Sequence, residues 1–332
     1  MPTRQMISLG LLALSVGWLA IHAPGAVVRE LWFLAVVLGL TIATRTVTYR
    51  ESLLGLSLGI GLAAPLMLLI GWTLASAGLD ASESALASWA VVPIIEEGLK
   101  LLPVWLVAVL YQRRTRRTLN PSDWLLVGCA VGAGFAMVEN AQLVRHDPGV
   151  LRDMARQYGP TLLVPGAWGF TGFVGHAAAT GMAAAGIGLW LALRRMARAT
   201  ATPSPLAAVA LMAPAGWVTL EHALANLRVN TGSDLAVWLG NGRLTPWLFL
   251  ALCALVVVID IRLAARAISR SRVFRVRLAL LRGALLGGRP ARVMPLPQRV
   301  TTALREARLV NAAAWTMLEA LLTTTTRRQE AA

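Results

Sequence analysis

Charged residues are scarce in this chain of 332 residues, at 14% of the total, whereas soluble domains carry roughly 25%. Hydrophobic residues make up 57% of the chain. Several apolar runs reach about 18 residues or more, which is the length needed to cross a bilayer. The shortage of charge therefore argues against an ordinary soluble domain and indicates a protein with several membrane-spanning helices.

Cysteine is also rare. The two cysteines, Cys129 and Cys253, both lie inside apolar runs and are far apart in the sequence. This arrangement excludes a disulfide framework and a zinc ribbon, which need more cysteines at short spacings. We interpret both as small residues of the protein core.

Lysine is nearly absent, since Lys100 is the only lysine among 31 basic residues and the others are arginine. The net charge of +15 could suggest a nucleic-acid partner. The arginines instead lie in short loops between apolar runs and in the C-terminal tail, a pattern typical of orientation signals and lipid contacts. We therefore expect the lipid bilayer as a partner and no nucleic acid.

The apolar runs predict an all-α, polytopic membrane protein with about eight transmembrane helices. The first run also has features of a signal peptide, but the loop charges fit best if it is retained. An apolar run that starts at residue 160 is too long for one crossing, and we expect Pro165-Gly166 to divide it. The predicted spans cover residues 6–21, 31–43, 53–75, 85–111, 124–144, 169–193, 206–227 and 244–263.

Loop charges predict how these spans are oriented. Arginines follow spans two, four, six and eight, and the loop after span three has two acids and no arginine. By the positive-inside rule both termini lie in the cytoplasm, as expected for a protein of the cytoplasmic membrane. We divide the chain into N-terminal helices (1–84), a catalytic core that carries the polar motifs (85–230), a last span with its loop (231–263) and a basic cytoplasmic tail (264–332).

Polar residues interrupt four consecutive spans of the core. A charge at membrane depth costs at least about 2.5–3.5 kcal/mol, so such residues need a structural or functional reason. The interrupting residues are Glu96, Glu97 and Lys100 in the fourth span, Glu139 and Asn140 in the fifth, His176 in the sixth, and Glu221, His222 and Asn226 in the seventh.

Four of these residues, one in each span, have the same predicted depth. Glu97, Glu139, His176 and His222 each lie about 16–18 residues from the cytoplasmic end of their span, or about 24–27 Å at roughly 1.5 Å per residue. Unrelated structural residues would scatter in depth. We therefore predict an active site in a four-helix core, within the outer half of the membrane.

Helical spacing predicts how the side chains are directed. Glu96 and Lys100 are four residues apart and share a face, whereas Glu97 points about 100° away and can face another neighbour. His222 and Asn226 also share a face. Glycine and alanine residues around His176 predict close helix packing and leave room for a substrate.

This set of residues suits water activation. A carboxylate at low dielectric can act as a general base, with a histidine sharing the proton, and Asn140 or Asn226 could donate to an oxyanion. If a metal is bound, we expect zinc, held by His176, His222 and Glu139. The chain has no His-Glu-x-x-His motif, and Glu96 with Lys100 could simply lock helices together.

The same order of motifs resembles the PrsW family of bacterial intramembrane proteases, which is distantly similar to the type II CAAX prenyl proteases. The matching residues are Glu96-Glu97-x-x-Lys100, Phe135-x-x-x-Glu139-Asn140, His176 and His222-x-x-x-Asn226. The resemblance implies a multi-helix membrane peptidase with Glu96, Glu97, Glu139, His176 and His222 in its active site. Some members cleave a membrane-anchored anti-sigma factor on its outer side. The alternative is a proton- or ion-coupled transporter, because buried charges also build proton relays.

Overall fold

The structure is a computed structural model, and it describes residues 3–76, 91–146, 173–198, 205–233, 235 and 242–269. The basic tail after residue 269 and the expected division at Pro165-Gly166 lie outside the described residues.

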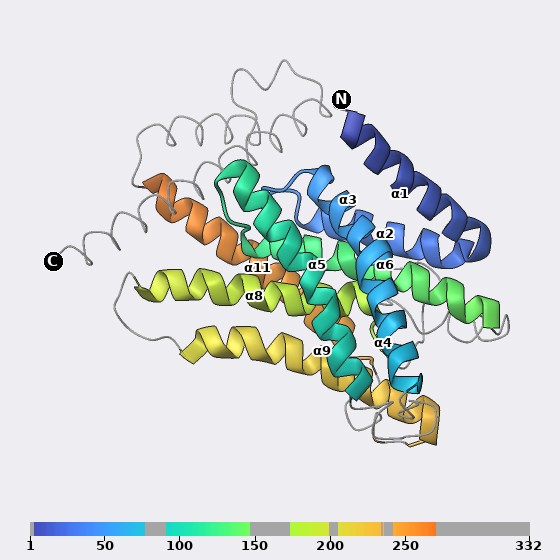
Figure 1. The fold of residues 1–332 in the computed structure, drawn as a ribbon. Coiled ribbons are helices and arrows are strands. Elements are labelled where there is room, and N and C mark those ends of the chain that lie inside the picture. Colours follow the sequence, from blue (N-terminus) through green and yellow to red (C-terminus); the bar gives the residue numbers. More distant parts are fainter. Residues whose placement is uncertain are drawn as a thin grey trace, which may run out of the picture.

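The described residues form helices joined by short connections, with no strand among them. Two of the helices, α3 (Tyr49–Leu58) and α4 (Ala64–Ser76), join through one π-helical turn into a single continuous helix. In chain order the elements are α1 (Thr3–His22), α2 (Pro24–Leu40), α3 (Tyr49–Leu58), the π-helix η1 (Gly59–Ala63), α4 (Ala64–Ser76), α5 (Val92–Thr115), α6 (Pro121–His146), α8 (His176–Arg198), α9 (Pro205–Thr231) and α11 (Thr245–Ser269), as Figure 1 shows.

Five helices in the described part are long and apolar enough to cross a membrane, so the chain is a multi-pass membrane protein. These five correspond to the predicted spans three, five, six, seven and eight. Helices α1, α2 and α5 lie where the other three spans are predicted, and the total of eight stays a prediction. The five segments are Tyr49–Ser76, Pro121–Leu143, His176–Arg194, Pro205–Arg228 and Thr245–Ala264.

Polar side chains tie together the helix ends at the start of α6. Asn120 and Asp123 cap this helix reciprocally, because each side chain accepts a hydrogen bond from the other's backbone N–H. Asp123 also accepts from the backbone N–H groups of Thr46 and Val47, at 2.7 and 3.0 Å. These bonds join the segment after α2 to the first turn of α6 and so set where α6 enters the bundle.

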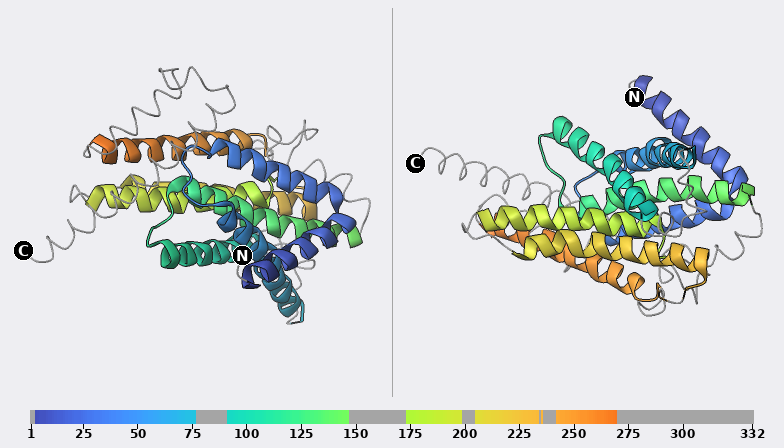
Figure 2. Two further views of the ribbon diagram at one scale, coloured as in Figure 1. Left: turned by 90° about the horizontal axis from the view of Figure 1, so that it is seen from above. Right: turned by 60° about the horizontal axis from the view of Figure 1, so that its bottom comes forward.

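Helices α6 and α8 form the centre of the bundle. Of their most apolar 18-residue windows, 89% and 83% of the residues are buried, against 28–33% in the three other spans. Helix α6 packs along α8, and α8 packs in turn against α9 and α11 (Figure 2). A membrane helix that is mostly buried in protein can carry polar groups that lipid-facing helices cannot.

Glycine allows α6 and α8 to approach closely. A side-chain carbon at Gly132 would overlap the backbone carbonyl of His176, and one at Gly128 would meet Thr180 and Ala184 of α8. The predicted small-residue packing near His176 is therefore present, and it serves this helix contact.

The central contact gives a stability prediction. Gly132→Ala should lower the free energy of unfolding by about 1–3 kcal/mol, since the added methyl group meets rigid backbone. Gly61→Ala is the matched control, because nothing lies within 4 Å of its added carbon. The unfolding midpoint in detergent is the measurement, and equal midpoints for the two variants would contradict the packing argument.

Helix α8 begins later than the predicted sixth span, which starts at residue 169. His176 is its first residue, and the preceding Gly175 has a φ angle of 92°. This backbone conformation favours glycine, and a helix cannot continue back through it. His176 therefore lies at a helix N-terminus, next to a turn of the chain.

Candidate active site

Helix α5 contributes two carboxylates and an ammonium group to one buried cluster. Lys100 Nζ lies 2.7 Å from Glu96 Oε1 and 2.8 Å from Glu97 Oε1. The three side chains are almost fully buried, with Lys100 at 0% exposure. The expected pair of Glu96 and Lys100 is present, but Lys100 also binds Glu97, because residues three apart on a helix are neighbours as well.

His176 of α8 links α5 to α6. Its Nδ1 atom lies 2.5 Å from Lys100 Nζ and 3.2 Å from Glu96 Oε1, and its Nε2 atom lies 2.6 Å from Glu139 Oε2. An ammonium group can only donate, so we assign Nδ1 as the acceptor and Nε2–H as the donor to Glu139. Both ring nitrogens of His176 therefore have a partner.

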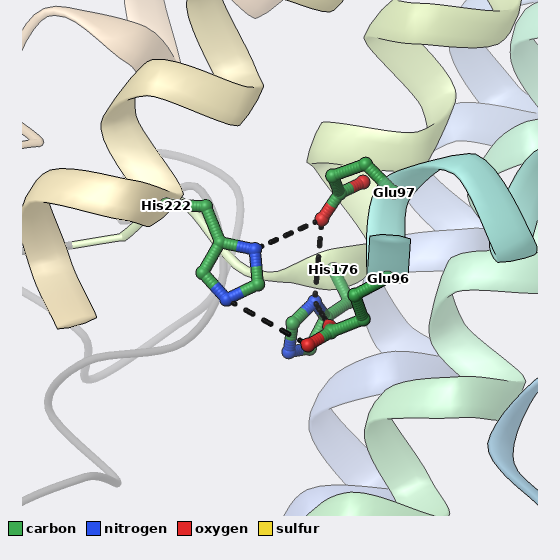
Figure 3. A group of neighbouring side chains, drawn as sticks. All are labelled: Glu96, Glu97, His176 and His222. Carbon is green, nitrogen blue, oxygen red and sulfur yellow. Dashed lines mark hydrogen bonds and ion pairs between the residues drawn. The ribbon is translucent and has the colours of Figure 1, made fainter. Parts of the chain in front are cut away.

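His222 of α9 completes the cluster, and its ring lies 5.2 Å from that of His176 between centroids. Its Nδ1 atom lies 3.1 Å from Glu97 Oε1, and its Nε2 atom lies 3.9 Å from Glu96 Oε2. In Figure 3 the two imidazoles face the two carboxylates from different helices. The sequence places these residues far apart, and the bundle brings them into one site.

Aromatic rings hold the two imidazoles in place. Phe173 stacks on His222 at 4.4 Å between ring centroids and meets the ring of His176 edge-on at 5.0 Å. Phe135 contacts His176 at 5.0 Å and lies 4.4 Å from Lys100 Nζ, so it also makes a cation–π contact. Sequence reasoning did not single out Phe173, although an aromatic residue three positions before a membrane histidine was a usable signal.

The other predicted polar residues have different surroundings. Glu139 contacts His176, but its side chain is 31% exposed. The amide of Asn140 donates to the Ala136 carbonyl of its own helix at 2.8 Å, so one of its N–H groups is used within α6. Asn226 lies half-buried one turn after His222.

Glu221 has a structural environment beside the cluster. It accepts a hydrogen bond from Thr245, the first residue of α11, and Thr245 in turn accepts from the indole N–H of Trp217 at 2.8 Å. The backbone N–H of Val174, in the turn before His176, also interacts with this carboxylate. Glu221 therefore connects α9 to α11 and to the turn that positions both imidazoles.

Four buried residues could together hold a metal ion. One donor atom from each of Glu96, Glu97, His176 and His222 lies within 4.8 Å of the others. Carboxylate oxygens and imidazole nitrogens are the usual non-sulfur ligands of zinc. The group contains the two predicted histidine ligands together with Glu96 and Glu97 of α5. The third predicted ligand, Glu139, is not in this group and instead contacts His176.

Comparison with known families settles what kind of protein this is. The model of a family described as PrsW family intramembrane metalloprotease matches residues 11–259. The match covers about three quarters of the chain and includes every residue of the cluster. The chain belongs to the PrsW family. No curated protein and no solved structure matches it.

PrsW membership makes the chain an intramembrane peptidase, and therefore a membrane hydrolase. It favours this class over the ion-coupled transporter that buried charges alone left open. The family description also implies a metal, and the donor set fits one. Lys100 Nζ lies 2.5–2.8 Å from three acceptor atoms, which shows that these side chains already surround a cation.

Proposed function

We propose that this PrsW-family peptidase hydrolyses a peptide bond of a membrane protein, such as a membrane-anchored anti-sigma factor, by activating water at the cluster. The observation that carries the proposal is the convergence of Glu96, Glu97, His176 and His222 from three helices at one buried point. Nothing in ordinary helix packing requires two carboxylates and two imidazoles to meet there, and their desolvation is costly.

Glu97 is the group that we assign as the general base. Its Oε1 atom is bound by Lys100 and His222, whereas its Oε2 atom is buried and has no hydrogen-bond partner in the structure. A water at Oε2 would give its proton to this carboxylate as its oxygen bonds to the scissile carbonyl carbon. The proton then passes to the leaving nitrogen as the C–N bond breaks.

Lys100 and Glu139 support this chemistry from two sides. The ammonium group of Lys100 balances the charge of the two α5 carboxylates, which would otherwise repel each other at close range. Glu139 Oε2 lies 2.6 Å from His176 Nε2, and this ion-pair contact fixes the ring orientation. Both residues act through their neighbours.

The donor set also suggests how a zinc ion would be bound. His176, His222 and Glu96 would hold it, and a bound zinc ion lowers the pKa of water and polarises a carbonyl group. Because Lys100 contacts His176 and Glu96, the lysine side chain would have to give up these contacts for both residues to hold an ion.

The membrane orientation is part of the same proposal. We place both termini in the cytoplasm of the cell and the cluster in the outer half of the cytoplasmic membrane. The arginine-rich loops support this orientation by the positive-inside rule. Cleavage would then occur near the outer surface.

Metal removal gives a direct test. A strong chelator should abolish cleavage of a single-span substrate by the purified enzyme, and added zinc should restore it. His222→Ala should lower the zinc content per protein at least about 10-fold, in line with the loss of a ligand or its support. His22→Ala is the control, because His22 is exposed and bonds to its own helix. Full activity of a metal-free preparation would contradict the zinc assignment.

A further inference from the structure

The turn that precedes α8 lies against α9 through two consecutive residues. Phe173 stacks on the His222 ring, with 4.4 Å between ring centroids and 19° between ring planes. The backbone N–H of the next residue, Val174, interacts with the carboxylate of Glu221, which directly precedes His222 in α9. One residue of the turn is therefore held by a ring and the next by a carboxylate, and these two partners are neighbours on α9.

The same turn leads directly into the second imidazole. Gly175 has a φ angle of 92°, and His176 follows it as the first residue of α8. The rings of His176 and His222 lie 5.2 Å apart between centroids, at 68° to each other, and both face the α5 carboxylates in Figure 3. The distance between the two imidazoles therefore depends on how firmly α9 holds the turn before α8.

Glu221 stands at the end of a chain of hydrogen bonds that run towards it. The indole N–H of Trp217 donates to Thr245 Oγ1 at 2.8 Å, and the Thr245 hydroxyl donates its own proton to Glu221 Oε1. An indole N–H and the backbone N–H of Val174 can only donate. A carboxylate accepts at both oxygens and suits donors on two sides, whereas an amide of the same shape would turn an N–H group towards one of them.

Glu221 itself lies outside the cluster. It is not one of the four residues whose donor atoms come within 4.8 Å of one another, and it faces Thr245 while His222 faces Glu97. Glu221 is only 6% exposed, and its Oε2 atom has no hydrogen bond of regular geometry in the described part of the chain. The interaction with Val174 is therefore mainly electrostatic and depends on the charge of the carboxylate. Burying this charge is costly, and holding the turn is the benefit that its contacts indicate.

We propose that Glu221 is a positioning residue of this peptidase, which holds the turn at residues 173–175 on α9 and thereby sets the distance and angle between the imidazoles of His176 and His222. The inference rests on the proposed function of the cluster and adds a residue that lies outside it. Residues that orient metal-binding or catalytic groups in this way usually change metal affinity or activity by about 10- to 100-fold when they are replaced.

Glu221→Gln tests the proposal, because it removes the charge and keeps the shape. It should lower kcat for a single-span substrate at least about 10-fold and weaken zinc binding to a similar extent. KM should stay within about two-fold, since the lost interaction orients the reacting groups and does not bind substrate. Zinc affinity is measured by competition with a chelator of known affinity, and the unfolding midpoint is recorded for each variant.

Glu51→Gln is the matched control. Glu51 is also a buried glutamate, at 3% exposure, and it pairs with Arg114 away from the cluster. This control should leave kcat and zinc affinity at the wild-type level. Phe173→Leu is a second test that keeps the buried carboxylate. It loosens the same turn by removing the stack on His222, so it should lower kcat and zinc affinity as Glu221→Gln does.

A rescue experiment tests the direction of the hydrogen-bond chain. Trp217→Phe removes the indole N–H, so the Thr245 hydroxyl can turn and accept from the amide that Glu221→Gln introduces. The amide oxygen is then free to face the N–H of Val174. Adding Trp217→Phe should therefore raise kcat of Glu221→Gln at least about 3-fold, a coupling of the size seen within one hydrogen-bond network. A plain loss of packing would make the double variant worse than Glu221→Gln.

Three results would overturn the positioning role. They are wild-type kcat and zinc affinity in Glu221→Gln, a raised KM at unchanged kcat, and an equal loss of kcat in Glu51→Gln. A wild-type enzyme that binds zinc and cleaves no membrane substrate would contradict the proposed function alone, because the zinc affinities of Glu221→Gln and Phe173→Leu would still decide whether Glu221 positions the imidazoles.

Discussion

Glu97→Gln should lower the cleavage rate of a single-span membrane substrate by about 100- to 10,000-fold, the usual contribution of a positioned general base. The amide has the shape of the carboxylate and can still accept hydrogen bonds from Lys100, but it cannot take a proton from water. His176→Ala should also abolish cleavage, because it removes the contacts with Lys100 and Glu139. The rate of product formation by purified enzyme in detergent is the measurement.

Two other glutamates serve as comparisons for this experiment. Glu51→Gln changes an equally buried glutamate that pairs with Arg114 and makes no contact with the cluster, so it should keep cleavage within a few-fold of wild type. Glu96→Gln should reduce cleavage less than Glu97→Gln does, because its amide oxygen can still serve as a ligand at the position that we assign to Glu96. Near-normal cleavage by Glu97→Gln with a severe loss in Glu96→Gln would transfer the role of base to Glu96.

Lys100→Met should produce the largest loss of stability of any single substitution in the cluster. It leaves two buried carboxylates without their ammonium partner, and removing one member of a buried ion pair typically costs about 3–5 kcal/mol. Arg114→Met removes the partner of Glu51, but Arg114 is 39% exposed, and a solvent-exposed pair is worth only about 0–1 kcal/mol. The two variants are compared by their unfolding midpoints in detergent with chelator present.

A double variant separates charge balance from catalysis. Glu96→Gln combined with Lys100→Met removes one carboxylate together with the ammonium group, so it should recover much of the stability that Lys100→Met loses. Cleavage should stay low, because the charge balance around Glu97 is altered. A Lys100→Met protein as stable as Arg114→Met would show that the carboxylates are not held by this lysine.

The positions of the helices followed from the lengths of the apolar runs. The predicted spans at 206–227 and 244–263 agree with α9 and α11 to within a few residues at their N-terminal ends. This works because a segment that crosses lipid must satisfy all its backbone groups internally, which leaves a helix as the local solution. Prediction failed at the start of α8, where Gly175 turns the chain in a stretch that is otherwise apolar.

Most residues that meet in the cluster were also predicted from the sequence, but their contacts were not. The equal depth of Glu97, Glu139, His176 and His222 in four spans predicts from the sequence alone that these residues lie together. That Lys100 also contacts His176 of another helix, and that Phe173 stacks on His222, could not be read from spacing. Spacing gives the angle between side chains on one helix, whereas a contact also depends on how each helix is turned towards its neighbours.

Composition and residue order were therefore sufficient for the class of protein, for five of the membrane helices and for most of the polar residues that meet in the cluster. These follow from local rules of burial and backbone hydrogen bonding that act on each segment separately. The rotation of α5, α8 and α9 about their axes, and the distance between α6 and α8, came only from packing. Glycine contacts such as Gly132 against His176 set that distance, and it determines which atoms of the carboxylates and imidazoles meet.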